Sequence, residues 1–174
     1  MPGGFHVGGW DNVVNYGQDL TTSQGTVVTS GAADTKGSYV QLTASTTYDI
    51  SGFIVSLGNA STTDNFSLDI ATGAAASETI IVPDLVFARN SATNMCINSY
   101  IPLAIPAGTR IAARAAASTA TKTIAVALVC FDATLTQDQS QAVATTYGWL
   151  AATTTGTLID PGAVAHTKGA YVEL

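Results

Sequence analysis

Residues 122–131 read Lys-Thr-Ile-Ala-Val-Ala-Leu-Val-Cys-Phe, the most apolar stretch of this 174-residue sequence. The side chains of a β-strand point alternately to its two faces, and here both faces are apolar. One face would carry Ile124, Val126, Leu128 and Cys130, and the other Ala125, Ala127, Val129 and Phe131. Because a strand that is apolar on both faces is typical of a sheet interior, we predict a central strand here.

The same alternation with a period of two dominates the rest of the sequence. Between Asn65 and Ala71, apolar residues alternate with Ser67 and Asp69, which predicts a half-buried strand whose polar residues face solvent. Further strands are predicted at residues 24–29, 38–44, 48–57, 78–82, 85–88, 95–105 and 109–117.

Two interruptions of this pattern predict local irregularities. The alternation changes phase at Ser51-Gly52, and a glycine inside a strand often marks a bulge. Pro83-Asp84 falls between two short apolar segments, so we expect two separate strands on either side of it.

The number and spacing of these segments indicate the fold class. About eight short strands with turn residues roughly every 10 positions are typical of an all-β chain folded as a β-sandwich. Among the β-sandwich architectures we expect a jelly roll, in which two sheets pack face to face.

The sequence near the C-terminus repeats the sequence near the N-terminus. Tyr16-Gly17 recurs as Tyr147-Gly148, Gly25-Thr26-Val27-Val28 as Gly156-Thr157-Leu158-Ile159, and Thr-Lys-Gly-Ser-Tyr-Val-Gln-Leu at 35–42 as Thr-Lys-Gly-Ala-Tyr-Val-Glu-Leu at 167–174. A separation of about 130 residues is too long for a solenoid repeat and has the size of a domain.

This repeat predicts the domain organisation. We expect a flexible N-terminal arm at residues 1–15, a β-sandwich domain at residues 16–132, and a linker with a partial second repeat at residues 133–174, equivalent to about residues 16–42. The last strand of the partial repeat needs hydrogen-bond partners. It could pair within its own domain, add to the sheet of a neighbouring subunit, or belong to a longer polypeptide.

The composition indicates that much of the surface is covered. Hydrophobic residues make up 47% of the chain and charged residues only 10%, whereas an ordinary globular domain has about 25% charged residues. We therefore expect assembly with other copies of the chain, with a trimer as the favoured state. A surface coated with uncharged Thr, Ser and Asn is the alternative.

The net charge, the absence of long apolar runs and the cysteines limit the expected binding partners and the expected cellular compartment. The net charge is −6 and the six basic residues are scattered, so nucleic-acid binding is not expected. No apolar run reaches the length of a membrane span, and no basic-then-apolar signal is present, so we expect synthesis in the cytoplasm and no membrane insertion. Cys96 and Cys130 are expected to be reduced and buried rather than disulfide-bonded.

The sequence predicts no catalytic, cofactor-binding or metal-binding residues. His6 and His166 are the only histidines, and neither lies in a pattern typical of a catalytic triad or a zinc site. Asp64, Asn65 and Asp69 lack the dense spacing of a calcium loop, so we interpret these acids as solvated turn residues.

A few aromatic residues are the candidates for intermolecular contacts. They could anchor a protein interface, or they could stack on the sugar rings of a glycan. These candidates are Phe5, Trp10, Tyr147, Trp149 and Tyr171.

Three segments between residues 43 and 131 are similar to those of a known family: Ser56-Leu57-Gly58-Asn59, Leu68-Asp69-Ile70-Ala71-Thr72-Gly73, and Ile101-Pro102-Leu103 followed by residues 105–114. On these segments the chain resembles the small jelly-roll virion proteins of tailed bacteriophages. The resemblance covers about half of the chain, is architectural, and transfers no functional residue. It implies a capsid decoration (cement) protein or a fibre component.

Taken with the composition, this resemblance predicts a non-enzymatic structural protein located in the virion, with its own copies and capsid or tail proteins as partners. The alternative is a carbohydrate-binding, lectin-like module that recognises a host surface glycan. A third hypothesis is a hydrolase acting on surface polysaccharide.

Overall fold

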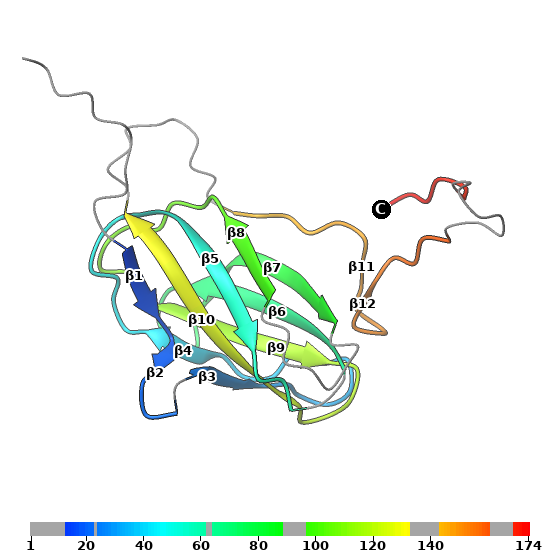
Figure 1. The fold of residues 1–174 in the computed structure, drawn as a ribbon, viewed down its shortest axis with the longest axis horizontal. Helices are drawn as coiled ribbons and strands as arrows, with labels where there is room; N and C mark the ends of the chain where they lie inside the picture. The colour runs from blue at the N-terminus through cyan, green and yellow to red at the C-terminus, as the bar shows by residue number, and fades with distance from the viewer. Residues whose placement is uncertain (1–12, 23, 62–63, 89–96, 133–142, 161–168) are drawn as a thin grey trace, which may run out of the picture.

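The computed structural model describes residues 13–22, 24–61, 64–88, 97–132, 143–160 and 169–174. In these residues the regular secondary structure consists of β-strands, which form two facing sheets and a separate small hairpin (Figure 1). The chain is therefore an all-β protein with a β-sandwich body, as predicted. The first twelve residues, which make up most of the predicted N-terminal arm, lie outside the described residues.

The first sheet has the strand order β2-β3-β10-β5-β8, and β1 also pairs with β10. All of its pairings are antiparallel. Its strands are β1 (Val13–Tyr16), β2 (Gln18–Asp19), β3 (Gln24–Thr29), β5 (Ile50–Gly58), β8 (Ile97–Ile101) and β10 (Thr123–Asp132). The predicted central position of the apolar stretch is confirmed, because β10 lies between β3 and β5.

The second sheet has the order β4-β9-β6-β7 and is also antiparallel. Its strands are β4 (Val40–Thr43), β6 (Asn65–Thr72), β7 (Thr79–Ala88) and β9 (Ile111–Ala117). The separate hairpin pairs β11 (Trp149–Leu150) with β12 (Thr155–Gly156) and lies to one side of the sandwich (Figure 1).

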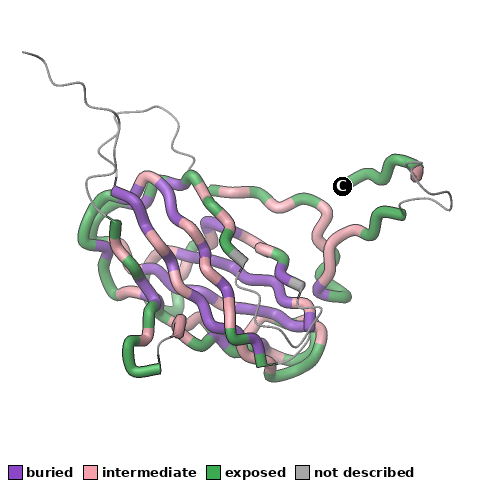
Figure 2. The backbone as a smooth tube through the Cα atoms, viewed as in Figure 1, coloured by how far each residue is buried: buried purple, intermediate pink, exposed green. Residues whose placement is uncertain are grey.

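The hydrophobic core lies between the two sheets, where buried residues follow the strands of both (Figure 2). Phe53 of β5 and Leu128 of β10 face Phe66 and Ile70 of β6 in a single buried cluster. One face of β10 is fully buried in this core, as predicted. Its other face is less covered, because Ala127 is only half-buried there.

The predicted bulge in β5 is confirmed. Along the β10–β5 pairing, Phe131 lies opposite Gly52 and Asp132 lies opposite Ile50, so Ser51 is an extra residue. The Ser51 hydroxyl donates a hydrogen bond to the Asp132 carbonyl at 2.8 Å, which holds the irregular backbone in place.

The expected break at Pro83-Asp84 is wrong. Residues Thr79–Ala88 form one continuous strand, β7, and the irregularity is absorbed as a bulge opposite Asp69. Asp84 has a φ of 50°, and its backbone N–H donates to the Asp69 carboxylate at 2.9 Å. A side chain of the neighbouring strand thus satisfies the backbone group that the bulge turns away from the ladder.

The expectation that Ser67 and Asp69 face solvent is also wrong. Both are buried, with exposed fractions of 0% and 2%. The outward face of β6 is covered because the Lys36 side chain reaches over it and contacts both residues. Asp64, interpreted as a solvated turn acid, is buried as well.

Cys130 is a buried free thiol, as predicted, and burial raises its pKa to about 12. Cys96 lies outside the described residues. Because the thiolate is the reactive species, we expect iodoacetamide at pH 8 to leave Cys130 unmodified in the folded protein and to modify it fully in urea. Peptide mass spectrometry measures both. Rapid labelling of Cys130 in the folded protein would contradict the buried placement.

Candidate functional site

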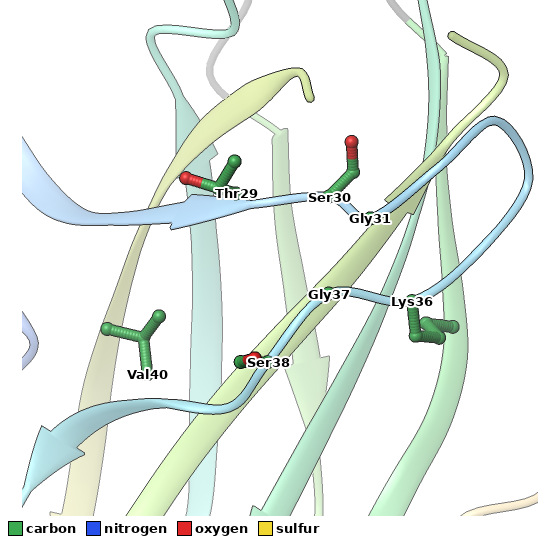
Figure 3. Close-up of a pocket in the computed structure, with 7 residues that line it drawn as sticks. All are labelled: Thr29, Ser30, Gly31, Lys36, Gly37, Ser38 and Val40. Carbon is green, nitrogen blue, oxygen red and sulfur yellow. The ribbon is translucent and has the colours of Figure 1, made fainter. Parts of the chain in front are cut away.

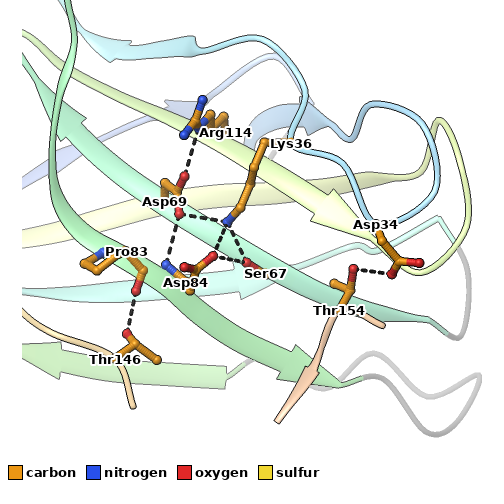
Figure 4. Close-up of polar contacts among 9 residues, drawn as sticks. All are labelled: Asp34, Lys36, Ser67, Asp69, Pro83, Asp84, Arg114, Thr146 and Thr154. Carbon is orange, nitrogen blue, oxygen red and sulfur yellow. Dashed lines mark hydrogen bonds and ion pairs between the residues drawn. The ribbon is translucent and has the colours of Figure 1, made fainter. Parts of the chain in front are cut away.

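The C-terminal segment, residues 143–160 and 169–174, contains three of the predicted contact residues: Tyr147, Trp149 and Tyr171. It first follows the outer edge of the second sheet, beside β7. The Ala144 N–H donates to the Ile81 carbonyl at 2.8 Å. The Thr146 hydroxyl donates to the Pro83 carbonyl at 2.5 Å (Figure 4). The segment therefore covers part of an edge strand that would otherwise expose unpaired backbone groups.

An ion cluster lies on the outward face of the second sheet, close to this segment (Figure 4). The Lys36 Nζ lies 2.7 Å from the Asp69 carboxylate and 2.9 Å from the Asp84 carboxylate. It also contacts the Ser67 hydroxyl at 2.5 Å. On the other side, the Arg114 Nε donates to Asp69 at 2.8 Å. Two cations and two carboxylates thus balance each other in a cluster that is mostly buried.

The strand pairing explains why Asp69 is the centre of this cluster. Asp69 of β6 lies directly opposite Arg114 of β9, and the β7 bulge lies on its other side. Burial opposes the ionisation of Asp69. This effect is outweighed by hydrogen bonds from Lys36, the Asp84 N–H and Arg114, together with the positive charge of Lys36. The pKa of Asp69 is therefore lowered from its ordinary value.

An aromatic ring covers the Arg114 side of the cluster. The Arg114 guanidinium carbon lies 4.7 Å from the centre of the Tyr39 ring, within the range of a cation–π contact. Burial is the main cause that raises the pKa of Tyr39 above its ordinary value. The Tyr39 hydroxyl is buried without a hydrogen-bond partner among the described residues. The Tyr39 ring reduces the contact of the Arg114 guanidinium with water, and an ion pair in less contact with water is stronger.

The hairpin β11–β12 contacts the same region. Thr154, in the turn between the two strands, is completely buried and donates to the Asp34 carboxylate at 2.5 Å (Figure 4). Trp149 of β11 places its ring 6.0 Å from the Lys36 Nζ. The hairpin is thus attached to the sandwich through the loop that precedes β4.

A shallow hollow of about 520 Å³ opens beside this loop, between the end of β3 and the approach to β4 (Figure 3). Its lining residues are Thr29, Ser30, Gly31, Lys36, Gly37, Ser38 and Val40. Lys36 is the charged residue of this lining, and its Nζ is bound to the ion cluster. The lining therefore offers hydroxyl groups, backbone and a lysine whose Nζ is engaged by carboxylates.

The structure describes three of the five predicted contact residues. Phe5 and Trp10 lie outside the described residues, as do both histidines. Tyr147 and Tyr171 are strongly exposed on the C-terminal segment. Trp149 is half-buried against Lys36.

Sequence reasoning missed the ion cluster and the attachment through Thr154. The one signal for the cluster was Lys36, which belongs to the repeated Thr-Lys-Gly block. Its partners Asp69 and Asp84 are more than thirty residues away, and sequence spacing does not bring them together.

No protein-family model matches the sequence, and no curated protein matches it significantly. The described residues contain no group of three or more metal-ligating side chains that could hold a metal ion. A search of the same residues found no helix with the length and hydropathy required to span a membrane.

Proposed function

We propose that this chain is a non-enzymatic structural protein of a tailed-phage virion, a jelly-roll module that assembles with copies of itself as a capsid decoration or fibre component. The observation that carries the proposal is the strand order. Apart from the hairpin β6–β7, consecutive strands from β3 to β10 alternate between the two sheets, in the orders β3-β10-β5-β8 and β4-β9-β6-β7. This connectivity supports a jelly roll, an architecture that is frequent in viral capsid proteins and lectins.

The surface supports assembly. Charged residues are scarce, and Lys36, Arg110 and Arg114 are engaged with carboxylates of the same chain. Large apolar side chains are exposed on strands of the sandwich itself: Val13 of β1, Val27 of β3, Val86 of β7 and Tyr100 of β8. Exposed apolar surface of this kind favours contact with other protein surfaces.

Light scattering coupled to size-exclusion chromatography tests the assembly. At micromolar concentration we expect a particle of three times the chain mass of 17.7 kDa. A species that keeps the mass of a single chain across the micromolar range would contradict self-assembly. Locating the sandwich in the density map of an intact particle would test the proposed place in the virion.

The alternative is a carbohydrate-binding module for a host surface glycan. The strong exposure of Tyr147 and Tyr171 favours it, since exposed aromatic rings stack on sugars. Binding to a glycan array that is lost in Tyr147→Ala or Tyr171→Ala and retained in Val13→Ala would support this alternative. An array without specific binding would remove it.

A further inference from the structure

The two copies of the sequence repeat have the same hairpin geometry. Gly17 and Gly148 both adopt a left-handed conformation, with φ of 75° and 73°. Each carbonyl accepts a backbone hydrogen bond at 2.6 Å, Gly17 from Thr26 and Gly148 from Thr157. The threonine hydroxyls donate to the same carbonyls at 2.9 and 3.0 Å. The hairpins β2–β3 and β11–β12 are thus two instances of one local structure.

The similarity extends to the strand that follows. A Cβ built on Gly17 would lie 3.1 Å from the Leu42 Cδ2, and one built on Gly148 would lie 3.0 Å from the Leu174 Cδ2. Leu42 and Leu174 occupy the last position of the two repeated blocks. The second copy therefore returns to its hairpin as the first does, although residues 161–168 are not described.

The two copies differ in how far their apolar side chains are buried. Tyr16 is 9% exposed and its counterpart Tyr147 is 75% exposed. Val28 is fully buried, whereas Ile159 is 63% exposed.

The same contrast holds at the end of the repeat, where Leu42 is 8% exposed and Leu174 is 64% exposed. The side chains that join the first hairpin to the core thus have counterparts of the same kind in the second hairpin, without a core around them.

The equivalent glycines Gly25 and Gly156 indicate which contact the second copy lacks. A Cβ on Gly25 would lie 2.6 Å from the backbone of Val126 in β10, so this position accepts glycine alone. The equivalent Gly156 has no such neighbour, since the nearest atom to its Cβ position is the Gly148 carbonyl oxygen at 3.9 Å. Position 156 therefore holds a glycine, the residue that close contact with a strand like β10 requires, but it makes no such contact.

We propose that residues 147–160 and 169–174 are the opening strands of a second β-sandwich, and that they dock on a sandwich body with the fold of residues 43–132. The hairpin would pair with the equivalent of β10, and residues 172–174 with the equivalent of β9. The sandwich of this chain cannot be that body, because residues 16–42 already fill these positions. This inference is independent of the proposed function.

The contacts of the hairpin agree with this role. Trp149 and Thr154, which contact the first sandwich, stand at positions where the first copy has Gln18 and Ser23. The exposed residues Tyr147, Ile159 and Leu174 keep the character of their counterparts. The residues specific to the second copy thus attach it to the first sandwich, and the repeated residues are left for the second body.

Hydrogen exchange on an extended chain tests the proposal. A second copy of residues 43–132 is appended after Leu174, and backbone exchange is followed by mass spectrometry. In the original chain, the amides of Leu158, Ile159 and residues 172–174 should exchange freely, whereas the Thr157 amide is already hydrogen-bonded within the hairpin. In the extended chain their exchange should slow by at least about 100-fold, because it then requires unfolding of the second sandwich.

Two controls make the result decisive. Gly156→Ala should abolish the new protection in the extended chain and leave exchange in the original chain unchanged. A chain extended by residues 16–132, whose second body has its own hairpin, should fold and leave the amides of Leu158 and Ile159 exchanging freely. Free exchange of the Leu158 and Ile159 amides in the chain extended by residues 43–132 would overturn the proposal. Protection in the original chain that rises with concentration would also overturn it, because the occupant would then be a second copy of the whole chain.

Discussion

Gly25→Ala is expected to destabilise the sandwich by on the order of 4–5 kcal/mol, at the upper end of single-residue effects. The added methyl group would lie 2.6 Å from the backbone carbon and oxygen of Val126. A flexible side chain could move away, but β10 is the central strand of the first sheet and pairs with β1, β3 and β5. The substitution therefore forces β3 away from the strand that holds it.

Gly156→Ala in the original chain is the matched control. It adds the same methyl group at the equivalent position of β12, where the nearest atom would be 3.9 Å away. We expect a change in unfolding free energy within about 0.5 kcal/mol. Urea denaturation followed by tryptophan fluorescence measures both variants. Equal effects of the two substitutions would show that the contact with Val126 does not explain the glycine in β3.

The alternation of apolar residues was sufficient to predict the all-β class, the β-sandwich and the central strand β10. Side-chain period and total apolar character are local properties, and they report directly on which face a strand buries. The bulge at Ser51 was predictable for the same reason, since an extra residue shifts the phase of the alternation in the sequence itself.

The ion cluster could not be predicted, because it depends on distant strands. Asp69 in a strand with alternating polarity is typical of a solvent-facing residue. It becomes buried because Lys36, in the loop before β4, reaches across the sheet. Likewise, Pro83 and Asp84 resemble a strand break until the Asp69 carboxylate on the neighbouring strand accepts a hydrogen bond from the bulged backbone.

Asp69→Ala is expected to cost about 3–5 kcal/mol, because it leaves Lys36 and Arg114 in a mostly buried site without their shared carboxylate. The same substitution also removes the acceptor for the Asp84 N–H in the β7 bulge. Glu173→Ala removes the same charge from an exposed position and should change the stability by less than about 0.5 kcal/mol. Urea denaturation at pH 7 measures the difference, and equal stabilities would contradict a structural role for the cluster.

The pH dependence of the folding stability distinguishes the contribution of the Asp69 charge from that of its side-chain shape. Its pKa in the folded protein is below the ordinary value of 3.8, so the folded state favours the ionised form. The resulting stability is fully present above about pH 5, where the carboxyl is ionised in the unfolded chain as well. It is lost as the pH falls below 4 and through the lowered pKa, because the folded state must then accept a proton at the cluster.

Asp69→Asn keeps the shape of the side chain and removes this titration. We therefore expect the stability difference between the original chain and Asp69→Asn to be largest near pH 6 and to shrink steadily as the pH falls toward 3. Denaturation series at several pH values give this difference directly. A difference that is independent of pH would mean that the geometry of Asp69, rather than its ionisation, stabilises the outward face of the second sheet.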